Sequence, residues 1–178
     1  EFAETVRVLD FDGIHLDQYG FPKGTVWTRS GETRDLADGF PPLINAAPEE
    51  IALATNTSYG LNIAALALPL ERGDIVLVSD REFPANVYPW LHLRQRGVEV
   101  ELAPVTAEGW PDEAHLLERV ADPRVKVLAV SLVQFSNGYA LDLGALSQAT
   151  RRTGTYLVVD AIQGLGQVPV DLQRTPVD

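Results

Sequence analysis

The chain has 178 residues, of which 46% are hydrophobic and 22% are charged, the usual balance of a globular domain with a core of its own. Its formal net charge of -11 argues against a nucleic-acid partner, because nucleic-acid-binding domains are basic. The absence of cysteine excludes a disulfide framework and a thiolate metal site. No apolar run reaches the length of a membrane span and no basic-then-apolar leader opens the sequence, so we expect no membrane partner and a cytoplasmic location.

The first part of the chain, residues 1–45, has no sustained hydrophobic period and carries several glycines and aromatic residues. Short strands are candidates at Val6–Leu9 and Ile14–Asp17. We predict an irregular N-terminal segment here and assign it no role.

The second part, residues 46–178, alternates short apolar runs with segments of helical period. The predicted strands are residues 51–55, 75–78, 98–102, 125–130 and 155–159. The predicted helices are residues 57–68, 85–96, 112–120 and 144–152. Continuous apolar strands that alternate with helices predict the α/β class, with a mostly parallel sheet covered by helices on both faces in three layers.

The two ends of the chain suggest that it is part of a larger domain. The sequence begins at Glu1 and contains no methionine, and it stops at Asp178 after an apparent strand without a closing helix. We therefore expect residues 46–178 to be a partial domain.

The functional residues of such a sheet are expected in the loops after its strands, because ligands bind outside the carboxyl ends of parallel strands. In the first of these loops, Thr57 and Ser58 open a helix. Free N–H groups, the positive end of the helix dipole and two hydroxyl groups favour an anion such as a phosphate. A plain helix cap is the commoner explanation for such residues.

Two further loops carry groups that suit a planar, polar ligand. Phe83 could stack on a flat ring, or it could be a core residue beneath a helix. Gln134 could reach a ligand through its amide, and Asn137 is a weaker candidate because Asn-Gly is also a plain turn signal.

The fourth loop follows the strand that ends in Asp160, with Gln163 three residues later. Four apolar or aromatic residues precede Asp160, so its carboxylate should be largely enclosed and in need of a partner. A cationic ring nitrogen, such as the pyridinium of pyridoxal phosphate, is a suitable partner. A helix or loop cap is the alternative.

Other kinds of site have less support. No grouping of His, Asp and Glu has metal-ligand spacing, and neither a G-x-G-x-x-G motif nor a P-loop lysine is present. Lys23 and Lys126 are the only lysines. Lys126 begins a strand at the edge away from the predicted site, which makes it a poor candidate for a Schiff base.

In their order and spacing, the four loops resemble the large domain of the class V aminotransferase-like family of pyridoxal phosphate enzymes, from about Pro48 to Asp178. The family has the fold type I architecture and includes cysteine desulfurases, kynureninases and isopenicillin N epimerase-like proteins. The resemblance implies pyridoxal 5′-phosphate as cofactor, an amino acid as substrate and a homodimer as assembly.

By the same resemblance, Thr57 and Ser58 would bind the cofactor phosphate and Phe83 would stack on the pyridine ring. Asp160 would pair with the ring nitrogen as the catalytic acidic residue, and Gln163 would bind the ring hydroxyl oxygen. The family's Schiff-base lysine would follow soon after the point where this chain stops.

The chain departs from the desulfurase pattern at two positions. Desulfurases usually carry histidine where this chain has Phe83, and commonly asparagine near Phe135. Phenylalanine at position 83 looks more like kynureninase, which favours a kynureninase-like or epimerase-like lyase, while lyase, aminotransferase and epimerase all stay open. The alternative hypothesis is a non-catalytic α/β binding or interaction module, a degenerate relative without the lysine.

Overall fold

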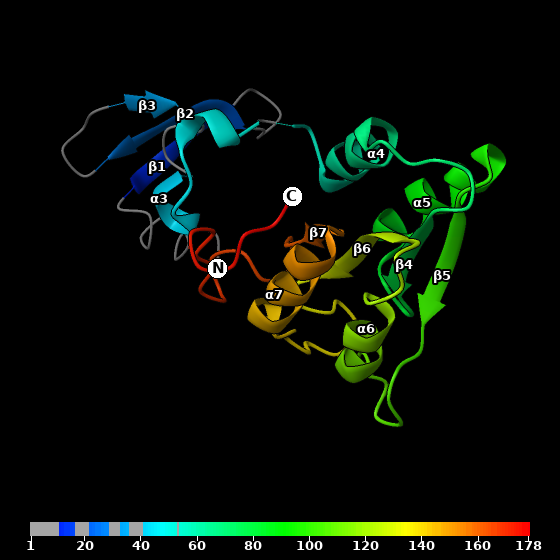
Figure 1. The fold of residues 1–178 in the computed structure, drawn as a ribbon. Helices are drawn as coiled ribbons and strands as arrows, with labels where there is room; N and C mark the ends of the chain where they lie inside the picture. Colours follow the sequence, from blue (N-terminus) through cyan, green and yellow to red (C-terminus); the bar gives the residue numbers. More distant parts are fainter. Residues whose placement is uncertain (1–10, 17–21, 29–32, 36–40, 53) are drawn as a thin grey trace. The chain divides into compact units, whose positions relative to one another are not determined.

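The chain forms two compact units in the computed structural model, which describes residues 11–16, 22–28, 33–35, 41–52 and 54–178. The first unit is residues 1–53 with 165–174, and the second is residues 54–164 with 175–178. Figure 1 shows the helices and strands of both units. The predicted boundary between residues 45 and 46 stays a prediction, because compactness does not show where independent folding begins.

The first unit contains a three-stranded antiparallel sheet in the order β1-β2-β3. Its strands are β1 (Phe11–Leu16), β2 (Pro22–Thr28) and β3 (Thr33–Asp35), followed by the short helices α3 (Pro41–Ile44) and η1 (Pro48–Glu50). The candidate strand Ile14–Asp17 overlaps β1, and Val6–Leu9 lies outside the described residues.

The second unit contains a parallel four-stranded sheet in the order β5-β4-β6-β7. The strands are β4 (Ile75–Ser79), β5 (Glu99–Ala103), β6 (Val125–Ser131) and β7 (Tyr156–Asp160). This topology confirms the predicted α/β class.

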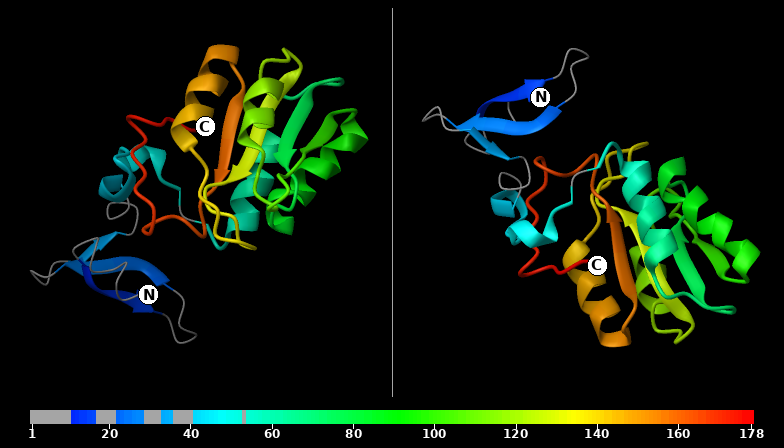
Figure 2. Two further views of the ribbon diagram at one scale, coloured as in Figure 1. Left: turned by 90° about the horizontal axis from the view of Figure 1, so that it is seen from below. Right: turned by 90° about the horizontal axis from the view of Figure 1, so that it is seen from above.

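Helices cover both faces of this sheet (Figure 2). Helix α4 (Thr57–Ala67) and α5 (Tyr88–His92) lie over one face, and α6 (Glu113–Arg119) and α7 (Leu143–Thr153) lie over the other. Within the described chain, no helix is both long enough and apolar enough to cross a membrane.

The core is built from strands that are apolar on both sides, as a doubly covered sheet requires. Side chains of β4, β6 and β7 alternate between the two helix layers. On the side of α4 and α5, the core joins Trp90 of α5 to buried residues of the strands, namely Val76, Val78, Val127, Ala129 and Val158. The sheet is therefore held from both faces, and the loops after its strands start from a rigid edge.

Two predicted elements differ from the structure. The predicted strand at residues 51–55 is wrong for the residues that are described there, which form no strand. A short apolar run becomes a strand only where a neighbouring strand takes up its backbone hydrogen bonds, and the sheet of the second unit contains only β4 to β7.

The predicted helix at residues 85–96 is divided into η2 (Pro84–Asn86), α5 and η3 (Leu93–Arg96). Pro89 explains the division, since it has no N–H to donate and its ring would clash with the carbonyl four residues earlier. The segment ends at Gly97, whose φ of 84° suits glycine.

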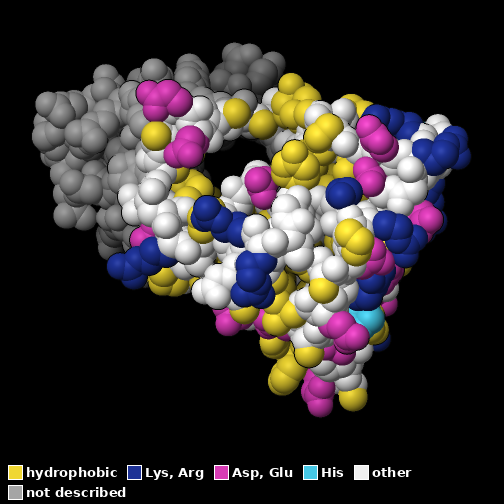
Figure 3. Space-filling view, in the orientation of Figure 1, with side chains coloured by type: hydrophobic (Ala, Val, Ile, Leu, Met, Phe, Trp, Pro, Cys, Tyr) yellow, Lys and Arg dark blue, Asp and Glu magenta, His cyan; other side chains and the backbone are white. Residues whose placement is uncertain are grey.

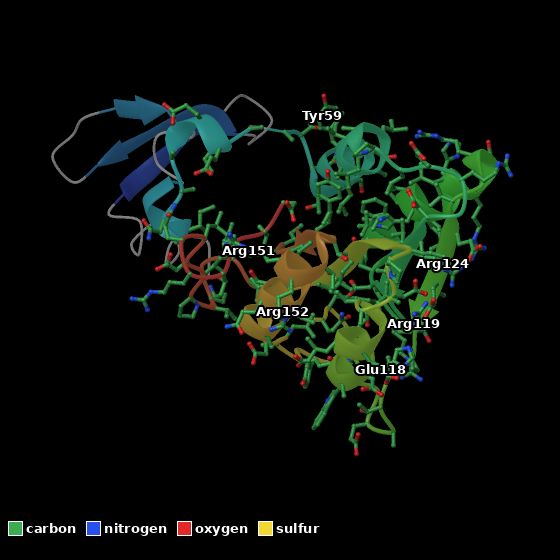
Figure 4. All side chains as sticks on the ribbon, viewed as in Figure 1. Tyr59, Glu118, Arg119, Arg124, Arg151 and Arg152 are labelled. Carbon is green, nitrogen blue, oxygen red and sulfur yellow. The ribbon has the colours of Figure 1, made fainter. Side chains whose placement is uncertain are left out.

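A bidentate ion pair ties the edge strand to a covering helix. The Arg119 guanidinium donates to both carboxylate oxygens of Glu101 on β5, at 2.7 and 2.6 Å. Figure 4 shows Arg119 and Arg124 on the side of the molecule formed by α6 and β5. The hydrogen bonds from Arg119 hold the pKa of Glu101 below its usual value of 4.5.

This pair predicts a pH dependence. A carboxyl group whose pKa is lowered by folding stabilises the protein above its unfolded pKa, and this contribution is lost as the pH falls through the lowered value. The difference in free energy of unfolding between wild type and Glu101→Gln should therefore be largest above about pH 5 and should shrink below it. Urea unfolding at a series of pH values measures this.

Glu99→Gln is the control, because Glu99 is 60% exposed and its contact with Arg124 is 3.8 Å long. A pH-independent difference for Glu101→Gln would contradict the assignment.

Candidate functional site

A cavity of about 250 Å³ opens at the carboxyl edge of the parallel sheet. It lies within the second unit, where the loops after β4, β6 and β7 meet the N-terminus of α4. Its lining consists of Asn56, Thr57, Ser58, Phe83, Ala85, Ser131, Val133, Phe135, Asp160, Ile162 and Gln163. Apolar side chains form one wall, and hydroxyl, amide and carboxylate groups form the rest.

Five of the six sequence-predicted binding residues line this cavity: Thr57, Ser58, Phe83, Asp160 and Gln163. Gln134 does not, although it follows the same strand as the lining residues Ser131 and Val133. The parallel topology brings together the loops after β4, β6 and β7, whereas the start of α4 lies at the same edge without a strand before it. The ligand contacts of all six residues stay predictions.

The N-terminus of α4 is capped by Asn56, whose Oδ1 accepts from the Tyr59 N–H at 2.9 Å. The alternative in which Thr57 or Ser58 is the cap is therefore wrong. Both hydroxyl groups stand in the first turn, beside backbone N–H groups that have no partner inside the helix. This end of the helix suits a phosphate that enters the cavity.

Asp160 is the last residue of β7 and is only 3% exposed. Its Oδ1 accepts from the Ile162 N–H at 3.1 Å. Its Oδ2 has no hydrogen-bond partner, the one such buried side-chain atom in the described part of the chain. Since buried polar atoms are almost always paired, this oxygen is suited to a donor that a ligand supplies.

Phe83 is 48% exposed and lies at the cavity, so the core alternative is wrong for this residue. Its ring meets Phe135 edge to face, with 5.3 Å between centroids and 81° between planes. The pair forms the aromatic part of the wall.

Gln134 is buried and turned away from the cavity. Its Nε2 donates to Oε1 of Glu82 at 2.6 Å. Glu82, which is 6% exposed, also accepts from the backbone N–H and the hydroxyl group of Ser131 and from Nδ2 of Asn86. Sequence reasoning missed Glu82. The available signal was a carboxylate three residues beyond the end of a fully buried strand, where a charge needs several donors.

Gly164 lets the loop after β7 approach the loop after β6. A Cβ at this position would stand 2.7 Å from Cδ2 of Leu132 and 2.9 Å from Cγ2 of Val133. Leu132 is buried, so its side chain has little room to move. The absence of a side chain at Gly164 therefore helps to set the width of the cavity.

The lysines agree with the sequence analysis as far as they are described. Lys126 is an exposed residue near the start of β6, at the opposite end of that strand from the cavity. Lys23 lies in β2, and its side chain is outside the described part of the structure.

The family model of aminotransferase class-V matches residues 32–178. The chain belongs to the aminotransferase class-V family. This membership confirms the resemblance that the four loops suggested. A second family model, glycosyl hydrolase family 66, matches residues 1–62, which is under half of the chain and overlaps the first match.

Related proteins agree with this membership. The chain is 32% identical over 147 residues to a probable cysteine desulfurase of Methanothermobacter thermautotrophicus, covering 83% of this chain and 36% of the relative. It is 33% identical over 177 residues to isopenicillin N epimerase of Amycolatopsis lactamdurans, covering 89% of this chain and 44% of the relative. Among solved structures, cysteine desulfurase CsdA of Escherichia coli is similar with a TM-score of 0.74 and 29% identity, covering 80% of this chain and 37% of that one.

These relatives are much longer than the chain, which spans 36% of the first of them and 44% of the second. The cystine C-S lyase C-DES shares the fold at a TM-score of 0.73 and 24% identity, and a mutant of it was solved with glycine covalently linked to its PLP cofactor. The prediction of a pyridoxal phosphate-dependent enzyme is confirmed at the level of the family.

The residues of the cavity fit this cofactor. Asp160 has a buried oxygen without a partner, which suits a protonated ring nitrogen, and the first turn of α4 has N–H and hydroxyl donors that suit a phosphate. The half-exposed ring of Phe83 in the lining offers an apolar face to a flat ring.

Gly164→Ala should destabilise the protein by about 1–3 kcal/mol, because overpacking a well-filled site forces its neighbours to move. Gly60→Ala is the matched control. A Cβ at Gly60 meets nothing within 4 Å, and alanine in a helix is favoured over glycine by roughly 1 kcal/mol. Urea unfolding of the two variants should shift the free energy of unfolding in opposite directions. Equal stability of Gly164→Ala and wild type would contradict the close approach of the two loops.

Proposed function

We propose that the protein to which this chain belongs uses pyridoxal 5′-phosphate in this cavity to act on an amino acid, as a lyase, aminotransferase or epimerase. The observation that carries the proposal is the buried, unpartnered Oδ2 of Asp160 at the end of β7. Family membership and the placement of the other polar groups support it.

Asp160 would accept a hydrogen bond from the ring nitrogen and hold the proton there, since an adjacent carboxylate favours the charged form of a base. A bound, protonated pyridine ring supplies an electron sink for bonds broken next to the amino group of the substrate. The hydrogen bond from the Ile162 N–H occupies Oδ1 and leaves Oδ2 of this lining residue without a protein partner. Gln163 would bind the ring hydroxyl oxygen.

Thr57 and Ser58 would orient the cofactor through its phosphate, using their hydroxyl groups and the N–H groups of the first turn of α4. Phe83 would stack on the ring and exclude water from one of its faces. These three side chains are uncharged. Asp160 is the only charged residue among the lining residues of the cavity.

The aromatic wall of the cavity, formed by Phe83 and Phe135, is relevant to the type of reaction. Phe83 and Phe135 cannot donate or accept a proton, so this wall provides no acid or base. A kynureninase-like or epimerase-like lyase, which the resemblance at Phe83 favours, is consistent with that wall. A desulfurase that relies on histidine at this position is not.

A homodimer and a cytoplasmic location are part of the same proposal. Helix α4 exposes Tyr59, Ile63 and Leu66 along one side, by 56%, 50% and 61%. Figure 3 shows apolar side chains gathered over α4, and Figure 4 shows Tyr59 on that helix. Such a surface supports contact with a second copy.

Sedimentation of the full-length protein should show a dimer, and a monomer would contradict this part of the proposal.

Asp160→Asn tests the proposed function in the full-length protein. The variant keeps the shape of the side chain but removes the charge that holds the ring nitrogen protonated. Turnover should fall by about 100-fold or more, the cost of removing one preorganised electrostatic contact. Cofactor absorbance should show that binding is retained in part.

The control is Asp112→Asn, because Asp112 caps α6 through the His115 N–H and asparagine caps a helix equally well. This variant should behave as wild type. Normal turnover in Asp160→Asn would overturn the role assigned to Asp160.

A further inference from the structure

Glu82 is a buried carboxylate that the proposed chemistry does not use. It accepts four hydrogen bonds: from the Ser131 N–H at 2.8 Å, the Ser131 hydroxyl group, Gln134 Nε2 at 2.6 Å and Asn86 Nδ2 at 3.3 Å. Hydrogen bonds to a charged acceptor are short and strong, so this arrangement holds the loop after β4 against the end of β6.

The same network reaches the core. Asn86 is fully buried, and its Oδ1 lies 3.5 Å from the indole Nε1 of Trp90, which donates to it. Trp90, on α5, is itself fully buried in the core between this helix and the sheet. The position of Glu82 is therefore fixed by a side chain of the core rather than by the loop alone.

Two adjacent side-chain pairs join the loops after β4 and β6. Gln134 donates the buried hydrogen bond to Glu82. The next residues of the two loops, Phe83 and Phe135, contact each other edge to face. The first pair is buried and the second is about half exposed at the cavity.

The aromatic pair depends on the buried pair for its orientation. Rings that are half exposed have room to turn, and an edge-to-face contact alone is a weak restraint. The hydrogen bond between Glu82 and Gln134 fixes the backbone immediately before both rings.

We infer that Glu82 is a positioning residue which, through Gln134 and Phe135, holds the Phe83 ring in the orientation needed to stack on the ring of the bound cofactor. This inference rests on the proposed function. It gives the two buried carboxylates of the site separate tasks. Asp160 keeps an oxygen for the ligand, whereas both oxygens of Glu82 are already occupied by protein donors.

The test measures binding of pyridoxamine 5′-phosphate to the full-length protein freed of its cofactor. This probe has the same ring and phosphate but no aldehyde, so only non-covalent contacts contribute. Glu82→Gln keeps the shape of the side chain and replaces one acceptor with a donor that faces other donors. Gln134→Met removes the amide at similar volume, and serves if Glu82→Gln does not fold. Each should raise the dissociation constant about tenfold, as expected for the loss of one well-placed contact.

A double-mutant comparison separates positioning from simple stability. In a Phe83→Leu background no ring remains to orient, so Glu82→Gln or Gln134→Met should weaken binding no further. Glu101→Gln is the control, because it removes a hydrogen-bonded carboxylate that does not line the cavity. It should leave the dissociation constant unchanged even where it lowers the melting temperature.

The outcomes distinguish this inference from the proposed function. If wild type does not bind the probe, both fail. If Asp160→Asn weakens binding but neither Glu82→Gln nor Gln134→Met does, the proposed function stands and the positioning role is overturned. Effects that simply add to that of Phe83→Leu would also overturn it.

Discussion

The site depends on the cost of burying a carboxylate at the end of a parallel strand. An unpaired buried polar group costs about 1–3 kcal/mol, and more if it is charged. Asp160 bears this cost at Oδ2, while its Oδ1 accepts one backbone N–H. Glu82, in the loop after β4, avoids the cost with four donors. Asp160 therefore has an oxygen left for a ligand, whereas the carboxylate of Glu82 is fully used in holding the protein together.

The parallel sheet makes this arrangement possible. Strands β4, β6 and β7 all run toward the same edge, and Ser131 lies opposite Asp160 in the register of β6 and β7. Helices on both faces leave the edge as the place where polar groups can meet a ligand. The aromatic wall and the first turn of α4 complete the cavity from outside the sheet. Membership of the aminotransferase class-V family supports the proposal that this cavity binds pyridoxal 5′-phosphate.

Sequence reasoning reached the architecture because hydrophobic periodicity is a local property. It predicted β4 to β7 and the loops that meet at the cavity, since parallel strands share one functional edge. It predicted one helix at residues 85–96 because periodicity alone does not show how Pro89 divides the segment. The strand predicted at residues 51–55 failed because a strand requires a partner, which a local pattern cannot supply.

Side-chain direction was the part that sequence could not give. Gln134 follows β6 and Asp160 ends β7, yet Gln134 turns to Glu82 and Asp160 lines the cavity. The direction of such a side chain depends on hydrogen-bond partners that are distant in the sequence. Glu82 and Gln134, for example, are 52 residues apart. For the same reason sequence reasoning missed Glu82, although its carboxylate accepts four hydrogen bonds.

The role of Asp160 can be tested by a crystal structure of the full-length protein with pyridoxal 5′-phosphate bound. We expect Oδ2 of Asp160 to lie about 2.7–2.9 Å from the ring nitrogen, the distance of a charge-assisted hydrogen bond. A cofactor whose ring nitrogen faces another group, with Oδ2 of Asp160 still unpartnered, would contradict it.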